Sequence, residues 1–594
     1  MKFSEFAITL ENIEKASSRN LMKDIVSDLI KVLDYNEVGE AMYLMQGRVV
    51  PRFISLEFNV AEKLILRVLE EISGKGIDEV ESVYRDLGDL GLVAEKYIEN
   101  LKSSINIKEV YDDLKKIASL EGEGSVDAKI NHVVELLKLC DSLSSRYIVR
   151  IIIGDMRLGV SDKSILDALS VVLVGDKSKR ELLDKVYGVR SDIGYIVKIA
   201  KEKGVKGVKD ISINLGIPIA SMNCEREETF QKILERFSPA IVQPKYDGLR
   251  CQVHYDQDII GTREIKQFES KDKSKEKGSK IMVFSRNLED LTDMFPELLS
   301  ALDKLKIKSV IFDCEVVGFD PETNKLVPFQ KTMKRKRKYE IKDTSQSIPI
   351  NAYVFDILYC NGKSYLDEPL SKRVDVISLI FKNADKQDVF KLAPSNKVSK
   401  KEKMGDLFDG YVQTGLEGII AKNPSSEYYP GKRGFDWIKF KKSKKGHLID
   451  NIDSVVLGYF SGYGDRAKFG IGAFLVGVKN ENTNKFESIA KVGTGVTDCQ
   501  WKKIKDKLDS ISVGKKPRSV LVSKQLKPNV WVKPEVVAVV EADEITKSPN
   551  HMAGMNEGKG YSLRFPRMFE FDRKDKNVDD ITTVAEVKRM YNLQ

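Results

Sequence analysis

The chain is poor in the residues that build metal clusters and disulfide frameworks. Its 594 residues include only six cysteines and four histidines. The cysteines stand at positions 140, 224, 251, 314, 360 and 499, without any Cys-x-x-Cys pair. This scatter argues against a zinc finger and against a disulfide-bonded scaffold. We therefore expect the cysteines to be small buried residues.

Long apolar runs and a strong excess of one charge are missing as well. No run of eighteen apolar residues occurs, and residues 1–4 do not resemble a signal peptide, so we expect no membrane contact and a cytoplasmic location. The 98 Lys and Arg residues stand against 89 Asp and Glu residues, which gives a net charge of +9. Such a mildly basic, heavily charged chain favours a polyanionic partner over lipid.

The first third of the chain has the period of a helical domain. A chain of this length allows three to five domains, each with its own core. From residue 1 to about residue 214, apolar residues recur at steps of three and four, as at Phe3, Phe6 and Leu10. This period predicts an all-helical domain.

Three arginines of that domain are spaced as on one face of a helix. In the segment 144–159, Arg146, Arg150 and Arg157 follow one another at spacings of four and seven. Such a stripe can lie along phosphates, which predicts a DNA-binding surface. A solvated face above a buried Ile/Val stripe is the other interpretation.

The segment 243–250, Gln-Pro-Lys-Tyr-Asp-Gly-Leu-Arg, places a lysine between two strand-like runs. An ammonium has no lone pair, and at an ordinary pKa of about 10.4 only on the order of one lysine in a few thousand is neutral at pH 7. Lys245 can therefore act as a nucleophile only if its surroundings favour the free amine, as a nearby cation such as Arg250 or a metal would do. Gly248 lets the backbone approach a ligand closely. A solvated lysine in a hairpin turn is the alternative.

Strand alternation groups charged residues further along the chain. Asp313 and Glu315 share one face of a β-branched run, and Lys439 and Lys441 share one face of another. Two carboxylates side by side are costly unless a positive charge lies beside them, which favours a metal or ribose site. Two ammonium groups held together favour a polyphosphate and lower the pKa of a third lysine nearby.

The pattern Lys-x-Asp-Gly-x-Arg at 245–250 resembles the first motif of the covalent nucleotidyltransferases, which are the DNA ligases, RNA ligases and mRNA capping enzymes. Five further motifs resemble theirs in the same order, at 281–287, 310–317, 353–359, 417–422 and 437–441. Segments 88–95 and 144–159 resemble the helical DNA-binding domain of replicative DNA ligases. The chain as a whole is similar to ATP-dependent DNA ligases of the archaeal and eukaryotic replicative type.

This resemblance implies a multidomain fold with three parts. We expect an all-α DNA-binding domain at residues 1–216, an α+β nucleotidyltransferase (adenylation) domain at 217–445 and a C-terminal β-barrel of the OB-fold type at 446–594. Short apolar runs at 453–459, 472–478 and 536–542, separated by glycine-rich turns, are typical of such a small barrel.

The resemblance also implies roles for particular residues. Lys245 would attack the α-phosphorus of ATP, and Glu315 and Glu417 would hold Mg²⁺ or Mn²⁺. The implied nucleotide-binding set comprises Gln243, Arg250, Arg286, Glu315, Phe355, Lys439, Lys441, Arg573 and Lys576. Within it, Arg250 lies at the ribose edge, Phe355 stacks on the base, and Arg286 contacts the nucleotide or the incoming 5′-phosphate. The terminal pair, Arg573 and Lys576, would orient the departing pyrophosphate.

Gln243 departs from the family pattern, which commonly has a glutamate at this place. That glutamate accepts a hydrogen bond from the adenine amino group. The Gln243 amide oxygen can accept the same bond but carries no charge. The use of other nucleotides, such as GTP, therefore stays open.

The expected function is ATP-dependent sealing of nicks in duplex DNA through a lysine–AMP intermediate, in replication, repair and recombination. We expect a monomer, and a sliding clamp is a partner by family analogy although no clear docking peptide is present. An RNA ligase with the same lysine chemistry is one alternative. A non-catalytic DNA-binding clamp is another, but it predicts no covalent adenylate and leaves the paired carboxylates unexplained. A P-loop ATPase is disfavoured, because Ile357 stands where the glycine upstream of Gly362-Lys363-Ser364 is needed.

Overall fold

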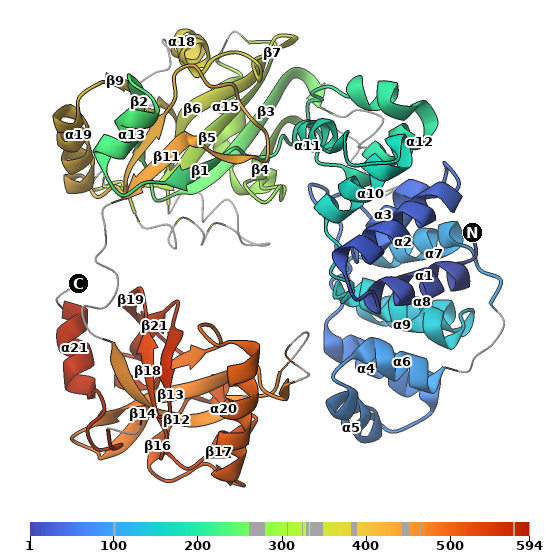
Figure 1. Cartoon of the computed structure of the whole chain (residues 1–594), viewed down its shortest axis with the longest axis vertical. Helices are drawn as coiled ribbons and strands as arrows, with labels where there is room; N and C mark the ends of the chain where they lie inside the picture. The colour runs from blue at the N-terminus through green and yellow to red at the C-terminus, as the bar shows by residue number, and fades with distance from the viewer. Residues whose placement is uncertain are drawn as a thin grey trace. The chain divides into compact units, whose positions relative to one another are not determined.

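The structure of the chain is a computed structural model (Figure 1). It describes residues 1–98, 103–260, 279–305, 307–323, 325–327, 332, 335, 348–381, 389–441, 451–462, 466, 469–573 and 576–592. The chain divides into two compact units, residues 1–442 and 443–594. The domain boundaries expected after residues 216 and 445 stay predictions. No helix among the described residues is long and apolar enough to cross a membrane.

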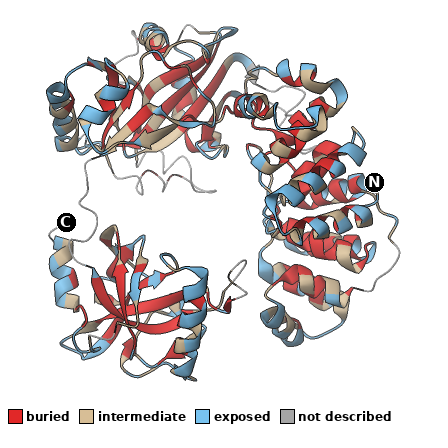
Figure 2. Cartoon of the chain, viewed as in Figure 1, coloured by how far each residue is buried: buried red, intermediate tan, exposed pale blue. Residues whose placement is uncertain are grey.

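The first unit begins with a helical region, as the sequence period predicts. Its helices are α1 (Phe3–Glu14), α2 (Arg19–Val32), α3 (Val38–Leu44), α4 (Glu62–Ser73), α5 (Ile77–Leu87), α6 (Leu90–Tyr97), α7 (Ile107–Ala118), α8 (Ser125–Lys138), α9 (Ser142–Ile153), α10 (Asp162–Val174), α11 (Arg180–Val189) and α12 (Ile193–Lys209). Phe3, Phe6 and Leu10, which carry the predicted period of α1, are fully buried. Figure 2 shows that buried residues gather where these helices face one another.

Helix α9 ends earlier than the arginine spacing implies. Its last residue is Ile153, and Gly154 follows with φ of 78°, a left-handed conformation that commonly stops a helix. Arg157 therefore lies in the loop before α10, with φ of 55°. The prediction that Arg146, Arg150 and Arg157 share one helical face is wrong for this reason.

The rest of the first unit is built on two sheets. One has the strand order β1-β11-β10-β2-β9, formed by β1 (Asn223–Arg226), β2 (Ala240–Lys245), β9 (Asn396–Val398), β10 (Gly418–Lys422) and β11 (Arg433–Lys441). The other has the order β4-β3-β5-β6-β7, with β8 beside β6, formed by β3 (Leu249–Ile260), β4 (Ser279–Ser285), β5 (Ser309–Gly318), β6 (Ile350–Cys360), β7 (Lys363–Ser364) and β8 (Phe390–Leu392).

Helices pack against each of these sheets. Residues of α13 (Phe230–Arg236) and α19 (Lys401–Gln413) share a core with β2, β10 and β11. Residues of α15 (Glu297–Leu302) and α18 (Leu370–Phe381) share a core with β3, β5 and β6. The two sheets meet through aromatic side chains, since the ring of Phe355 on β6 lies 6.2 Å from that of Trp437 on β11, edge to face. The Lys245 loop, which joins β2 to β3, connects one sheet to the other.

The second unit is rich in strands. Its elements are β12 (Ile452–Phe460), β13 (Ala473–Asn480), β14 (Lys485–Val492), α20 (Asp498–Ser510), β15 (Ser512–Val513), β16 (Val520–Leu521), β17 (Val530–Val532), β18 (Val537–Glu541), β19 (Glu544–Ser548), β20 (Ala553–Asn556), β21 (Lys559–Arg564), β22 (Arg567–Phe571) and α21 (Val584–Asn592). Strand β12 pairs with β13, β17 and β18, and β22 pairs with β18. The strands β19, β21 and β20 form a second sheet, which meets β14 where the Met552 N–H donates to the Ser488 carbonyl at 3.0 Å. The predicted fold class is confirmed in its helical N-terminal region and in its strand-rich C-terminal unit.

Candidate functional site

Lys245 stands at the end of β2, where strand registers bring it next to a second lysine. Gly418 of β10 is paired with Lys245 on one side and with Lys441 of β11 on the other. Cross-strand partners point to the same face of a sheet, so both lysines flank this position. Both lysines form ion pairs with Glu417, the residue before Gly418. Nζ of Lys245 lies 2.6 Å from its Oε2 atom, and Nζ of Lys441 lies 2.8 Å from the same atom.

A second carboxylate, Glu315 of β5, is coupled to this group. Burial raises the pKa of Glu315 to about 7, although the positive charges of Lys245 and Arg250 oppose the shift. Burial also raises the pKa of Glu417, but Lys245 and Lys441 outweigh it, and the pKa of Glu417 lies below its ordinary value. The positive charge of Lys245 thus lowers the pKa of both carboxylates.

Gly248 holds the lysine loop against β5. Its backbone N–H donates to the Glu315 carboxylate. A Cβ atom on residue 248 would lie 2.6 Å from the Val316 carbonyl oxygen, which is too close for any side chain. The sequence analysis expected Gly248 to let the backbone approach a ligand. In the structure it lets the lysine loop pack closely against β5.

Asp313 and Glu315 have different partners although they stand only two residues apart on β5. Asp313 is fully buried, and its Oδ2 accepts from Arg250 Nη2 at 2.7 Å and from Tyr428 Oη at 2.8 Å. Arg250 also donates to the Met222 carbonyl at 2.7 Å. Of the two carboxylates predicted to need a positive charge beside them, Asp313 thus has Arg250, whereas Glu315 is influenced by both Lys245 and Arg250.

Polar and aromatic groups from both sheets of the first unit gather near Gln243. Gln243 is buried, and its Nε2 donates to Ser395 Oγ at 2.9 Å and to the Phe355 carbonyl at 3.4 Å. Phe355 is half-buried, with the Arg250 guanidinium 5.3 Å from its ring centre. Gln243, Phe355 and Arg250, which are far apart in the sequence, therefore lie around one place.

Sequence reasoning missed Lys422 as a part of this site. It is 1% exposed, and its Nζ lies 3.9 Å from the ring centre of Trp437 and 4.6 Å from that of Phe355. Burial lowers its pKa to about 8. Strand spacing could have indicated this position, because Lys422 follows Gly418 and Ile420 at steps of two residues and therefore shares their face of β10.

Lys439 and Arg286 lie close to Lys441. Burial lowers the pKa of Lys439, and the positive charges of Arg433, Lys441 and Arg286 lower it further. Arg286 is exposed, and its guanidinium donates to the Asn223 side chain. The positive charges of Lys441 and Arg286 therefore act on Lys439, and a common role of the three in phosphate binding stays a prediction.

The chain resembles known proteins over its whole length. Three family models match: DNA ligase N terminus at residues 2–170, ATP dependent DNA ligase domain at 273–441, and ATP dependent DNA ligase C terminal region at 467–576. The probable DNA ligase of Dictyoglomus turgidum is 39% identical over 596 residues, which cover 100% of this chain and 98% of the relative. This chain belongs to the ATP-dependent DNA ligase family. The DNA ligase of Sulfolobus acidocaldarius is 34% identical, again over 100% of this chain and 98% of the relative.

A solved structure shows the same fold. The protein described as Pmar-Lig_Pre matches with a TM-score of 0.55 and 15% identity, over 95% of this chain and 98% of that chain. Membership of the family implies that the ligase uses ATP.

The terminal pair of predicted nucleotide-binding residues belongs to the second unit of the ligase. Asp453 of β12 contacts both, with Oδ1 3.1 Å from Arg573 Nη1 and Oδ2 against Lys576 Nζ. These three residues line a pocket of about 650 Å³. The pair is thus held together on one carboxylate.

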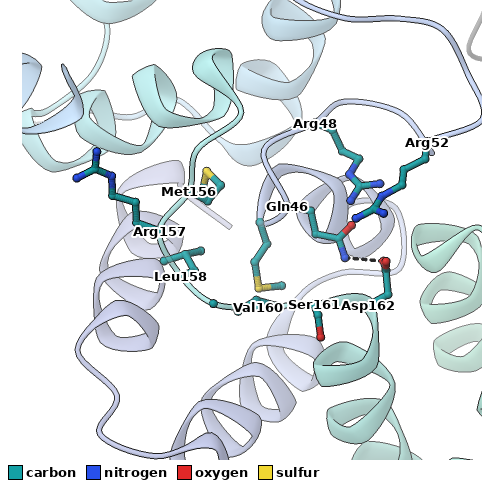
Figure 3. Close-up of a pocket in the computed structure, with 11 residues that line it drawn as sticks. Gln46, Arg48, Arg52, Met156, Arg157, Leu158, Val160, Ser161 and Asp162 are labelled. Atoms are coloured by element: carbon teal, nitrogen blue, oxygen red, sulfur yellow. Dashed lines mark hydrogen bonds between the residues drawn. The ribbon is translucent and has the colours of Figure 1, made fainter. Parts of the chain in front are cut away.

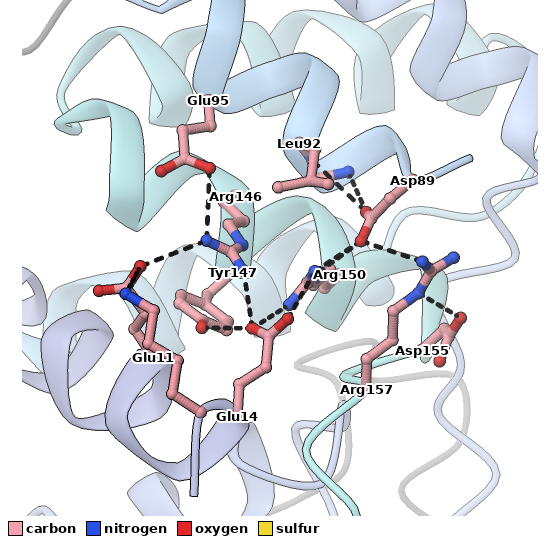
Figure 4. A network of polar contacts seen from close by, with 12 residues as sticks. Glu11, Glu14, Asp89, Leu92, Glu95, Arg146, Tyr147, Arg150, Asp155 and Arg157 are labelled. Atoms are coloured by element: carbon pink, nitrogen blue, oxygen red, sulfur yellow. Dashed lines mark hydrogen bonds and ion pairs between the residues drawn. The ribbon is translucent and has the colours of Figure 1, made fainter. Parts of the chain in front are cut away.

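The arginines predicted to bind DNA take part in a buried ion network (Figure 4). Arg146 Nη2 lies 2.8 Å and Arg150 Nη1 2.7 Å from Oε2 of Glu14, and Arg150 also contacts Asp89 at 2.5 Å. Arg146 and Arg150 are 8% and 3% exposed. Arg157 is more open but donates to the Gly88 carbonyl at 2.9 Å. The predicted exposed stripe is wrong in its geometry, and the DNA-binding role of these residues stays a prediction.

Two other arginines of the helical region face each other in a pocket of about 200 Å³ (Figure 3). Arg48 and Arg52 come from the loop between α3 and α4 and stand opposite Ser161 and Asp162 at the start of α10. Burial lowers the pKa of Arg48, and the charge of Arg52 lowers it further. The sequence analysis did not single out either arginine, because they lie outside any helical period.

Proposed function

We propose that this ligase seals nicks in duplex DNA through a covalent AMP adduct on Lys245. The contact of Lys245 and Lys441 with one oxygen of Glu417, next to Glu315, supports the proposal most directly. It provides a lysine, a nearby cation and two carboxylates in a family whose members are described as ATP-dependent. Replication and repair both produce such nicks.

The first step requires the Lys245 ammonium to release its proton to the surrounding water. As Lys245 becomes neutral, Glu417 keeps a counter-charge, because Lys441 already contacts the same oxygen at 2.8 Å. The free amine then attacks the α-phosphorus of ATP. A nitrogen–phosphorus bond forms, and the bond to the bridging oxygen breaks as pyrophosphate leaves.

Two transfers to DNA complete the reaction. The 5′-phosphate of the nick attacks the phosphorus of the adduct, which frees Lys245 and forms a 5′–5′ anhydride. The 3′-hydroxyl then attacks the DNA phosphorus, so that a phosphodiester forms and AMP leaves. Such transfers depend mainly on positioning and on neutralised charge, which Lys439, Lys441 and Arg286 can supply.

The two carboxylates fit a divalent cation. The described residues contain no group of three or more His, Cys, Asp or Glu side chains suited to a metal. Mg²⁺ commonly takes only one or two protein carboxylates, with substrate phosphates and water as the other ligands. Glu315 and Glu417 would hold it, and when bound it would neutralise phosphate charge. Phe355 would stack on the base, and the predicted place of Arg250 at the ribose edge stays untested.

For DNA, we place the phosphate contact of the helical region at Arg48 and Arg52. Arg146 and Arg150 already have carboxylate partners, so binding a phosphate would cost them buried ion pairs. The charge of Arg52 lowers the pKa of Arg48 by more than the charge of Asp162 raises it, and a further anion between the two guanidinium groups would relieve the remaining repulsion. The planar guanidinium group of an arginine can also donate two parallel hydrogen bonds to the oxygens of one phosphate.

Intact mass after incubation with ATP and Mg²⁺ tests the proposal. The unaltered chain and a control, Lys397→Ala on β9 of the same sheet, should each gain the mass of one AMP. Lys245→Ala should gain none. An AMP adduct on Lys245→Ala would overturn the assignment. A gel assay on nicked DNA and nicked RNA, with and without ATP, separates a DNA ligase from an RNA ligase and from a non-catalytic clamp.

A further inference from the structure

We infer that Ser395 determines nucleotide specificity by holding the Gln243 amide in one orientation. In that orientation the amide oxygen is presented to the base, so that adenine is accepted and guanine rejected. The inference rests on the proposed function, because it requires the base to bind beside Phe355. Ser395 lies in the segment between β8 and β9 and belongs to none of the motifs.

The hydrogen-bond partners of Gln243 determine the positions of the oxygen and the NH₂ group of its side-chain amide. Ser395 has a single hydroxyl proton, and it donates this proton to the Ala393 carbonyl at 3.3 Å. Toward Gln243, 2.9 Å away, the Ser395 oxygen can therefore only accept. The other partner, the Phe355 carbonyl, is an acceptor by nature. Both neighbours thus require the NH₂ end of the amide.

A rotated amide would lose its bond to the Phe355 carbonyl, which also accepts from Lys422 Nζ at 3.4 Å. Its oxygen would then face the Ser395 oxygen, and the Ser395 hydroxyl could donate to it only by giving up its own bond to the Ala393 carbonyl. Because Gln243 is 3% exposed, water cannot readily replace the lost bonds. The observed orientation is therefore the stable one, and it directs Oε1 away from these two acceptors.

The position of Gln243 places this oxygen where a base would be read. Gln243 and Lys245 are two residues apart on β2, so their side chains share a face. On the facing sheet, Phe355 contributes both the carbonyl that fixes the amide and the ring expected to stack on the base. A nucleotide with its α-phosphate at Lys245 and its base stacked on Phe355 would therefore have that base next to the Gln243 amide.

Orientation matters here because glutamine, unlike glutamate, has a donor end as well as an acceptor end. Adenine carries an amino donor at its 6-position, whereas guanine carries an oxygen acceptor there. An amide that could rotate would serve both bases. An amide fixed with its oxygen toward the base bonds adenine and sets oxygen against oxygen for guanine, which a buried site rejects strongly.

The experiment compares AMP and GMP transfer to Lys245 by intact mass, in four chains. They are the unaltered protein, Ser395→Ala, Gln243→Glu, and the double variant. We expect the unaltered protein to prefer ATP, and Ser395→Ala to lower the ATP-to-GTP rate ratio by about five- to ten-fold, the effect of one hydrogen bond. Gln243→Glu has two equivalent acceptor oxygens, so adding Ser395→Ala to it should leave the ratio unchanged.

Each other outcome overturns a distinct claim. An unchanged ratio in Ser395→Ala, or an equal fall in both backgrounds, would show that Ser395 does not act through the amide. A failure of the unaltered protein to take up either nucleotide would overturn the proposed function itself.

Discussion

Replacing Gly248 with alanine should displace the lysine loop from β5. The added Cβ would lie 2.6 Å from the Val316 carbonyl oxygen, 2.7 Å from Val317 Cγ2 and 2.9 Å from Glu315 Cγ. Non-bonded heavy atoms are comfortable at about 3.5 Å or more, so loop and strand must separate by roughly 1 Å. Such overpacking costs about 1–3 kcal/mol of stability. A shift of that size in a reactive group lowers rates on the order of 100-fold.

The same substitution at Gly410 is the matched control. Gly410 lies within α19 in the same unit, and nothing approaches within 4 Å of its ideal Cβ position. Alanine is better than glycine inside a helix by about 0.8–1 kcal/mol. Thermal unfolding should therefore move to lower temperature for Gly248→Ala and to higher temperature for Gly410→Ala, and only the first should slow AMP transfer to Lys245. Equal midpoints and equal rates in the two variants would refute the reasoning.

Three other changes test separate features. Arg373 and Asp356 are both fully buried and lie 2.7 Å apart, so Arg373→Met should cost about 3–5 kcal/mol in a denaturant titration, because it strands a buried carboxylate; an effect under about 1 kcal/mol would contradict this. The pKa of Glu315 is raised from 4.5 to about 7, so its contribution to stability is complete below about pH 4.5 and is lost as the pH rises through 7. Glu315→Gln should therefore reduce the difference in urea midpoint between pH 5 and pH 8, and an undiminished difference would count against the buried acid. Arg48→Ala combined with Arg52→Ala should weaken binding of nicked duplex and flatten the plot of log K against log salt by up to about 1.8, whereas an unaltered slope would place the phosphate contacts elsewhere.

The sequence by itself determined the features that depend on local spacing. A helical period of three and four positions marked the first region, and alternation along a strand placed Lys439 with Lys441. These patterns are local, because the geometry of one helix or strand fixes which neighbours share a face. The order of the motifs then led to the ligase family, which the full-length relatives confirm.

Only the tertiary structure decided which charges and dipoles are partners. Arg150 meets Asp89 from 61 residues away, and the Gln243 amide is held by Ser395 from 152 residues away. No spacing rule reaches across such distances, because these pairs depend on how whole helices and sheets pack. Arg146 and Arg150, predicted to form part of a DNA-binding stripe, thus lie in a buried ion network. Ser395, which belongs to no motif, is the hydrogen-bond partner of Gln243, the residue expected to contact the base.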